Sequence, residues 1–329
     1  MKLYDLVIIG GGPTGLNCAI AARHAGLDYL ILEKGMLANS IYHFPANMTF
    51  FSTSRLLEIG DTPFISHGEK PTRGEALEYY RRLHQHFLLQ VRLYEEVRDM
   101  NRCADGHYEL HTNKSSYQAR AVIVATGFYD TPRMLEVPGE GLPKVKHYYD
   151  DPHPYTGQKV LVVGAANSAC QVALELWHKG AEVSMAIRGN EIYKGVKYWI
   201  RPDIENRIKE GSIKAYFQTV VKEIKASEVL LEGPDGPFRL DNDWVLAMTG
   251  YQPNYVLLER LGLATPTDGN RIPLHSPDSL ESANLPNVYL AGVVCAGMET
   301  NKLFIENTRD HANIIIGQIG ERLKQNVEV

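Results

Sequence analysis

Short apolar runs alternate with amphipathic stretches along most of the chain, and glycines stand at the junctions between them. Residues 4–9 form an apolar run that predicts a buried strand, and three glycines follow it directly. Residues 16–25 then predict a helix, and residues 29–32 predict a second strand. A strand, a helix and a strand in succession make a β-α-β unit, in which the strands are parallel and the crossover is right-handed.

The same pattern returns in the middle of the chain. Residues 160–163 predict a strand, Gly164 opens a turn, residues 168–178 predict a helix, and residues 183–187 predict the next strand. Residues 71–90 and about 303–323 predict two further helices. The remaining short apolar runs are expected as strands at residues 91–97, 108–112, 121–125 and 287–292.

Length and composition favour a globular chain of two domains. The chain has 329 residues, of which 44% are hydrophobic and 22% charged, which excludes a disordered chain. The net charge of −5 disfavours nucleic acid as a partner. No apolar run is long enough for a membrane helix, and Asp5 interrupts the short N-terminal run, so we expect a cytoplasmic protein that lacks a signal peptide.

The cysteines give no sign of a metal or dithiol site. None of the four forms a C-x-x-C pair or shows ligand spacing with histidine, so we expect neither a structural zinc ion nor another metal. They stand at Cys18, Cys103, Cys170 and Cys295.

The first glycine motif, residues 10–15, fits the G-x-G-x-x-G pattern of dinucleotide-binding loops. Gly10 permits the tight turn, Gly12 lets the backbone approach a pyrophosphate, and Gly15 lets the helix pack close to the strand. Glu33 ends the second strand, where a carboxylate accepts hydrogen bonds from ribose hydroxyls and repels a 2′-phosphate. The motif therefore predicts a site for FAD or NAD and disfavours NADP.

The second motif, residues 164–169, is a degraded version in which Ala166 replaces the glycine of closest approach. Asn167 and Ser168 can donate to phosphate oxygens or cap the helix. Arg188 ends the following strand, where a guanidinium suits a 2′-phosphate, although a solvated strand-end charge is the alternative. We interpret this motif as an NADPH site.

Two nucleotide sites in one chain indicate a flavoprotein, because a flavin accepts the hydride that a nicotinamide delivers. Residues 125–127 (Ala-Thr-Gly) and 248–250 (Met-Thr-Gly) each end a strand and are interpreted as paired crossings between domains. The expected fold is α/β, with two Rossmann-like, doubly wound, three-layer nucleotide-binding domains, one inserted in the other. Residues 1–127 and 251–329 would bind FAD, and residues 128–250 would bind NADPH.

Several longer motifs resemble the bacillithiol disulfide reductase family, which are thioredoxin-reductase-like flavoproteins. The resemblance covers essentially the whole chain, and its most specific segments are F-F-S-T at residues 50–53 and F-I-E-N at residues 304–307. It implies NADPH-driven reduction of a low-molecular-weight thiol disulfide by FAD, in a homodimer. The expected FAD contacts are Gly10, Gly12, Pro13, Thr14, Gly15, Glu33, Lys34, Ser52, Thr53, Val97, Thr126, Gly127, Gly292 and Phe304. The expected NADPH contacts are Gly164, Asn167, Ser168 and Arg188.

One departure from the family leaves the electron acceptor open. The family typically has a cysteine inside the first glycine motif, and here that position is Thr14, which cannot form a mixed disulfide. Cys295 is the remaining candidate for a redox-active thiol. A ferredoxin- or flavodoxin-NADP reductase, which needs no cysteine, is one alternative, and a flavin-based redox sensor is another. The acceptor is therefore expected to be a small-molecule disulfide or a small redox protein.

Overall fold

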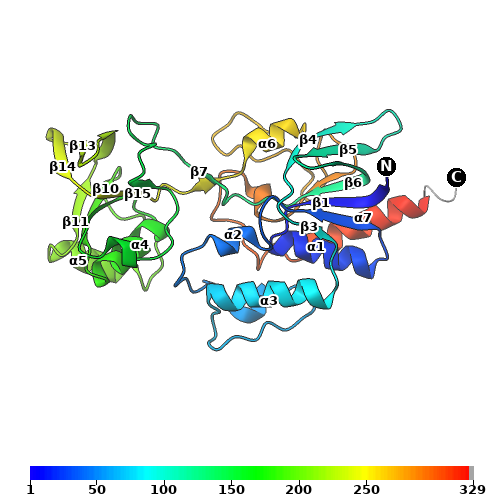
Figure 1. The fold of residues 1–329 in the computed structure, drawn as a ribbon, viewed down its shortest axis with the longest axis horizontal. Helices are drawn as coiled ribbons and strands as arrows, with labels where there is room; N and C mark the ends of the chain where they lie inside the picture. Colours follow the sequence, from blue (N-terminus) through cyan, green and yellow to red (C-terminus); the bar gives the residue numbers. More distant parts are fainter. Residues whose placement is uncertain (326–329) are drawn as a thin grey trace. The chain divides into compact units, whose positions relative to one another are not determined.

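The computed structural model describes residues 1–325, which form two compact units (Figure 1). Unit 1 comprises residues 1–43, 47–131 and 251–325, and unit 2 comprises residues 44–46 and 132–250. The first crossing thus lies a little later than residue 127, and residues 44–46 belong to unit 2 instead of the first domain. The later crossing has a local cause, because the strands β7 (Thr131–Pro132) and β16 (Tyr251–Gln252) pair with each other there.

A twisted sheet forms the centre of unit 1. Its parallel part has the order β3-β2-β1-β6-β17, made by Val91–Arg92, Tyr29–Leu32, Leu3–Ile9, Ser116–Val124 and Val288–Leu290. The first half of β6 also pairs with an antiparallel extension made by β5 (Tyr108–Thr112) and β4 (Val97–Arg102). Strands β1, β2 and β17 are buried along most or all of their length, as expected of parallel strands covered on both faces.

Helices and a second apolar cluster cover the two faces of this sheet. On one face, α1 (Pro13–His24) and α7 (His311–Gln325) pack side by side (Figure 1). On the other face, residues of the parallel strands form an apolar core with α6 (Tyr255–Arg260) and with the antiparallel extension of β4 and β5. The remaining helical segments of unit 1 are α2 (Asn39–Tyr42), η1 (Ser54–Leu57), α3 (Arg73–His86) and η3 (Gly292–Ala296).

Unit 2 repeats this architecture. Its parallel sheet has the order β11-β10-β9-β15-β8, made by Lys214–Phe217, Glu182–Ile187, Lys159–Val163, Trp244–Ala247 and Val145–Lys146. One face packs on α4 (Asn167–His178) and α5 (Arg201–Lys209). The other packs on an antiparallel sheet of β12 (Val220–Ile224), β13 (Glu228–Gly233) and β14 (Gly236–Asp241), and η2 (His153–Tyr155) precedes β9. The predicted α/β fold of two Rossmann-like, three-layer domains is confirmed.

Some predicted element boundaries are wrong, and each has a local cause. Helix α3 is shorter than residues 71–90, because Thr72 and Glu75 form a capping box at its start and Leu88 has a φ of +47° after its end. The run at residues 91–97 is split between β3 and the start of β4. The last helix begins at His311, well after residue 303.

The late start of α7 follows from side chains that compete with the helical backbone. Thr308 Oγ1 donates to the Phe304 carbonyl at 2.8 Å, and Asn307 Oδ1 accepts from the Phe304 N–H at 2.7 Å. Phe304 therefore lies in a turn-rich segment ahead of the helix. Among the described residues, no helix combines the length and apolarity that crossing a membrane requires.

Candidate nucleotide-binding sites

The glycines of the first loop differ in the room that they leave for a Cβ. A Cβ on Gly10, whose φ is +111°, would lie 2.5 Å from the Ala125 carbonyl oxygen, and a Cβ on Gly15 would lie 1.9 Å from the Gly10 oxygen. A Cβ on Gly12 would meet no atom within 4 Å. Gly12 is also the N-cap of α1, no side chain caps that helix, and Pro13 follows at its start. The backbone at Gly12 is thus open to a ligand beside helical N–H groups that favour an anion.

Glu33 ties the end of β2 to this loop. Its Oε2 accepts from the Gly11 N–H at 2.7 Å and its Oε1 from the Gly35 N–H at 2.8 Å. Burial raises the pKa of Glu33, and the two N–H groups counteract this effect. A carboxylate offers about four lone-pair sites, so both oxygens can still accept a hydroxyl.

The carboxyl ends of β6 and β17 lie at the same edge of the sheet as the glycine loop, since all these strands are parallel. Thr126 follows β6, and its Oγ1 is buried without a hydrogen-bond partner among the described residues. Gly127 has a φ of +69°, and a Cβ there would lie 3.8 Å from the Val293 side chain. An orphaned hydroxyl beside an open glycine indicates that this edge is built to receive a polar ligand.

Thr14 lies directly against the segment that follows β17. A Cβ on Gly292, whose φ is +80°, would lie 2.7 Å from Thr14 Oγ1. The Gly292 N–H donates to His311 Nδ1 at 3.1 Å. Burial lowers the pKa of His311, with a further contribution from His275, which favours the neutral ring that accepts this bond. The start of α7 therefore fixes the backbone that packs on Thr14.

The other residues predicted to contact FAD have different structural environments. Lys34 forms an ion pair with Asp130 at 2.8 Å. The Val97 side chain is part of the apolar core of unit 1. Ser52 is buried, Thr53 is the N-cap of η1, and Phe304 is 42% exposed.

The segment that carries Phe304 is tied to η1 and α1 by hydrogen bonds. Arg309 Nη1 donates to the Arg55 carbonyl at 3.2 Å. Asn17 Nδ2 donates to the Arg309 carbonyl at 2.8 Å, and Asn17 Oδ1 accepts from the Gly60 N–H at 3.1 Å. Unit 1 thus brings the F-F-S-T and F-I-E-N motifs into one neighbourhood.

The second glycine loop repeats the geometry of the first. A Cβ on Gly164, whose φ is +131°, would lie 2.6 Å from the Met248 carbonyl oxygen, as Gly10 approaches Ala125 in unit 1. Ala166 is the N-cap of α4, and no side chain caps this helix. Ser168 is exposed. The Asn167 side chain accepts from the Lys197 N–H at 2.9 Å and donates to the Gly195 carbonyl at 3.3 Å, so it holds the neighbouring loop.

Arg188 stands exposed at the end of β10. Within the described chain, its guanidinium makes no ion pair, whereas nearby Arg201 is engaged by Glu205 at 2.6 Å and by Glu191 at 3.8 Å. An uncommitted guanidinium at this position suits a phosphate group.

Three of the four cysteines are buried, and Cys295 is one of them. Burial raises the pKa of Cys18, Cys170 and Cys295 to about 12 in each case. A thiol with such a pKa is almost entirely protonated at neutral pH and is a poor nucleophile. The assignment of Cys295 as a redox thiol stays a prediction that these properties disfavour.

Sequence reasoning missed two residues that organise the site, His311 and Asn17. His311 is a single histidine without a motif, and its contact with Gly292 depends on the tertiary fold. Asn17 did carry a signal, because a polar residue between Leu16 and Cys18 interrupts the apolar face of α1. Polar groups buried in this way are normally hydrogen-bonded.

The geometry and the sequence together define the class of the protein. The profile described as "Pyridine nucleotide-disulphide oxidoreductase" matches residues 7–292. The chain belongs to this family and is an oxidoreductase. Membership implies FAD and NADPH as cofactors, and the open backbone at Gly12 and the orphaned Thr126 hydroxyl fit the first of them.

Within the family, the chain is similar to proteins that are named as a bacilliredoxin reductase and as bacillithiol disulfide reductases. It is 41% identical over 317 residues to the bacilliredoxin reductase Bdr of Bacillus subtilis, covering 96% of this chain and 97% of that protein. The structure of the bacillithiol disulfide reductase Bdr (YpdA) from Staphylococcus aureus matches with a TM-score of 0.94 and 38% identity, over 98% of this chain and 99% of that chain. These matches confirm the resemblance that the motifs predict.

A more distant relative is the ferredoxin–NADP reductase of Enterococcus faecalis. It is 27% identical over 307 residues, which cover 89% of this chain and 84% of that protein.

Proposed function

We propose that this chain is an NADPH-dependent flavoprotein that reduces a low-molecular-weight disulfide of the bacillithiol type. The observation that carries the proposal is the pair of matching glycine loops with opposite charges at the following strand ends. Glu33 directly follows β2 beside the first loop, and Arg188 directly follows β10 beside the second. A carboxylate suits a ribose diol and a guanidinium suits a 2′-phosphate, so the two loops favour FAD and NADPH respectively.

In unit 1, Gly12 would give the FAD pyrophosphate its close approach, and the uncapped N-terminus of α1 would favour its charge. Glu33 would accept hydrogen bonds from the adenine ribose through lone pairs that Gly11 and Gly35 leave unused. The Thr126 hydroxyl would gain the partner that the described chain does not provide.

In unit 2, the uncapped N-terminus of α4 and the exposed Ser168 would receive the NADPH pyrophosphate. Arg188 would pair with the 2′-phosphate. Asn167 would act indirectly, because its amide group already holds the loop at residues 195–197.

When bound, FAD would supply the two-electron redox chemistry that links NADPH to the acceptor. At the start of η3, two side chains hold the backbone of Gly292 in place. His311 accepts the Gly292 N–H through Nδ1, and Thr14 packs on the same glycine. For a disulfide acceptor, one NADPH and one proton yield two thiols and NADP⁺. We also propose, on the resemblance alone, a homodimer that acts in the cytoplasm.

A ferredoxin- or flavodoxin-type acceptor is the second candidate, and one observation favours it. Burial leaves Cys18, Cys170 and Cys295 protonated at neutral pH, and position 14 is threonine. A one-electron protein acceptor needs no thiol from the enzyme. The name of the relative at 38% identity, a bacillithiol disulfide reductase, favours the disulfide.

A steady-state assay distinguishes the two acceptors. NADPH oxidation is followed with bacillithiol disulfide, ferredoxin or flavodoxin as the acceptor, and released thiol is counted with a chromogenic reagent. We expect two thiols per NADPH with the disulfide. Turnover with ferredoxin or flavodoxin and none with the disulfide would replace the first candidate by the second.

A further inference from the structure

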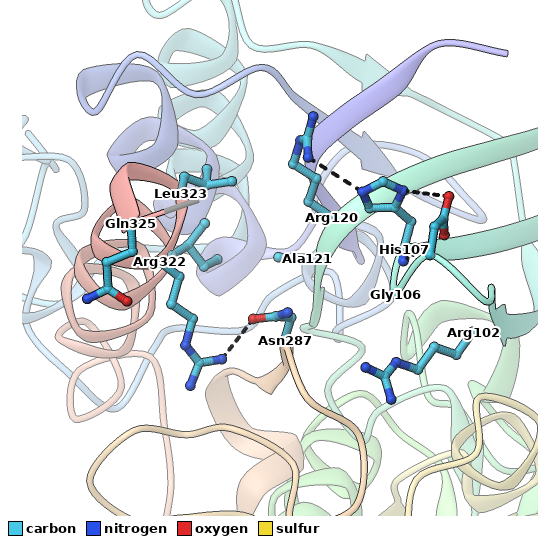
Figure 2. A pocket seen from close by; sticks show the side chains of 11 residues that line it. Arg102, Gly106, His107, Arg120, Ala121, Asn287, Arg322, Leu323 and Gln325 are labelled. Carbon is cyan, nitrogen blue, oxygen red and sulfur yellow. Dashed lines mark hydrogen bonds and ion pairs between the residues drawn. The ribbon is translucent and has the colours of Figure 1, made fainter. Parts of the chain in front are cut away.

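Several side chains around a polar pocket of unit 1 bind one another (Figure 2). Arg322 donates to Asn287 Oδ1 at 2.7 Å. His107 lies between two partners, since its Nδ1 is 3.1 Å from Asp105 Oδ2 and its Nε2 is 3.5 Å from Arg120 Nη1. These side chains have partners within the chain, so they do not call for a ligand. The second glycine loop, in unit 2, presents the opposite case.

The hydrogen bonds around the two glycine loops show which residues of the two units correspond. The Gly10 N–H donates to the Leu32 carbonyl at 2.9 Å. In unit 2, the Gly164 N–H donates to the Ala186 carbonyl at 3.0 Å. Each bond joins the first glycine of a loop to the neighbouring parallel strand. The residue after Leu32 therefore corresponds to the residue after Ala186.

These two residues are Glu33 and Ile187, and a second pair of bonds supports the correspondence. The Glu33 carbonyl accepts from the Glu95 N–H at 2.8 Å, and the Ile187 carbonyl accepts from the Thr219 N–H at 2.9 Å. Both donors follow the outermost parallel strand of their unit, β3 in unit 1 and β11 in unit 2. Ile187 thus stands where unit 1 has a carboxylate.

This exchange leaves two backbone donors of unit 2 without an acceptor. In unit 1, the Glu33 carboxylate binds two N–H groups, whose counterparts in unit 2 belong to Ala165 and Gly189. The Ile187 side chain is buried in the apolar core against which Ala165 packs, and it has no acceptor atom. Within residues 1–325, neither of the two N–H groups donates to another acceptor. Gly189 is exposed, so its N–H is open to a ligand.

We propose that Ile187 is a determinant of the preference for NADPH over NADH, an inference that rests on the proposed function. An apolar side chain at this position offers no acceptor to a ribose diol and no negative charge that would repel a 2′-phosphate. Arg188 directly follows Ile187 and corresponds to Lys34, so it brings a positive charge next to the Gly189 N–H. Two adjacent residues thus favour the phosphate, one by its charge and the other by the absence of a carboxylate.

Binding of NADP⁺ and NAD⁺ to the FAD-loaded protein, measured by isothermal titration calorimetry, tests this inference without an electron acceptor. The informative variant combines Ile187→Glu with Ala165→Gly and so restores the pair that unit 1 has. The second change is needed because a Cβ on Gly11 would lie 3.1 Å from the Glu33 Cβ. We expect the ratio of the NAD⁺ to the NADP⁺ dissociation constant to fall at least about tenfold. The matched control, Ile187→Gln with Ala165→Gly, adds the same shape without the charge and should shift the ratio much less.

Because Ile187 is buried, the Tm and the FAD content of the charged double variant are checked against those of its control. Arg188→Glu, at an exposed position, tests the same register if the double variant does not fold. Side chains alternate along a strand, so this carboxylate would point away from the place that Glu33 occupies in unit 1. We expect Arg188→Glu to weaken NADP⁺ binding without tightening NAD⁺ binding.

The outcomes separate this inference from the proposed function. An unmodified protein that binds NAD⁺ as tightly as NADP⁺ would refute the proposed use of NADPH, and this inference with it. A preference for NADP⁺ that persists in the folded charged double variant would overturn the inference alone. Tighter binding of NAD⁺ by Arg188→Glu would also overturn it, because the position that reads the ribose would then be residue 188.

Discussion

Replacing Gly12 by alanine separates flavin binding from folding. The added Cβ would meet no protein atom within 4 Å, and Gly12 has a φ of −78° that alanine adopts without strain. As an N-cap, alanine is less stabilising than glycine by roughly 0.5–1 kcal/mol. Alanine also restricts the unfolded chain more than glycine does, which raises the free energy of unfolding by about 0.4–1 kcal/mol. The two effects nearly cancel, so the Tm of the apoprotein should change by less than about 2 °C.

Flavin affinity should change much more. If FAD binds as proposed, the Cβ occupies the space through which the pyrophosphate approaches the backbone. Each hydrogen bond to a charged group that is lost costs about 1.5–3 kcal/mol of binding free energy. The loss of one or two such bonds raises the dissociation constant of FAD by roughly tenfold to 10⁴-fold. The assay is fluorescence titration of apoprotein with FAD, together with the absorbance ratio at 450 and 280 nm of purified protein.

Two other glycines provide the controls. Gly317→Ala lies on the exposed face of α7 with no atom within 4 Å, so it should raise stability by about 0.5–1 kcal/mol and leave FAD affinity unchanged. Gly15→Ala would place a Cβ 1.9 Å from the Gly10 oxygen and should impair folding itself. Unchanged FAD affinity in Gly12→Ala would refute the placement of the pyrophosphate at this loop.

Three further predictions follow from the same geometry. Arg188→Ala should lower the preference for NADPH over NADH, measured as the ratio of the two kcat/KM values, by about 1–3 kcal/mol. Arg239→Ala, which changes another exposed arginine of unit 2, should leave this ratio unchanged. An unchanged ratio in Arg188→Ala would refute the assignment of Arg188 to the 2′-phosphate. Cys295→Ser should keep disulfide turnover, since burial leaves that thiol protonated; normal flavin reduction with lost turnover would instead identify it as a redox thiol. Because the pKa of His311 is lowered in the folded state, its contribution to stability is present above about pH 6.5 and is lost as the pH falls through the folded pKa. In urea unfolding of the apoprotein from pH 7.5 to 5, the free energy of unfolding should therefore fall less steeply with pH in His311→Gln than in the unmodified protein. An identical pH dependence in the two proteins would contradict the role given to this ring.

The parts of the fold that local signals determine were predicted well. Both glycine motifs lie between a buried strand and a helix, and the sequence also shows the acidic and basic strand ends. These features depend on residues close in sequence, where turn chemistry and periodicity act directly. The division between parallel and antiparallel pairing in the unit 1 sheet could not be predicted, since β17 and β5 pair with different halves of β6.

The errors arose where side chains or distant contacts override local pattern. Asn307 and Thr308 satisfy backbone groups ahead of α7, so a stretch with helical periodicity remains a turn. The role of His311 depends on a segment nineteen residues away in sequence, at Gly292. Asn167 has suitable chemistry for a phosphate, yet the fold uses its amide to hold a loop, which no spacing rule reveals.

The most direct test of the proposed function is an anaerobic half-reaction. The purified protein is reduced with one equivalent of NADPH, mixed with bacillithiol disulfide, and followed at 450 nm for return of the oxidised flavin absorbance. We predict complete reoxidation with two thiols released per flavin, at a rate that supports steady-state turnover. A flavin that NADPH reduces but that the disulfide leaves reduced would contradict the proposed activity.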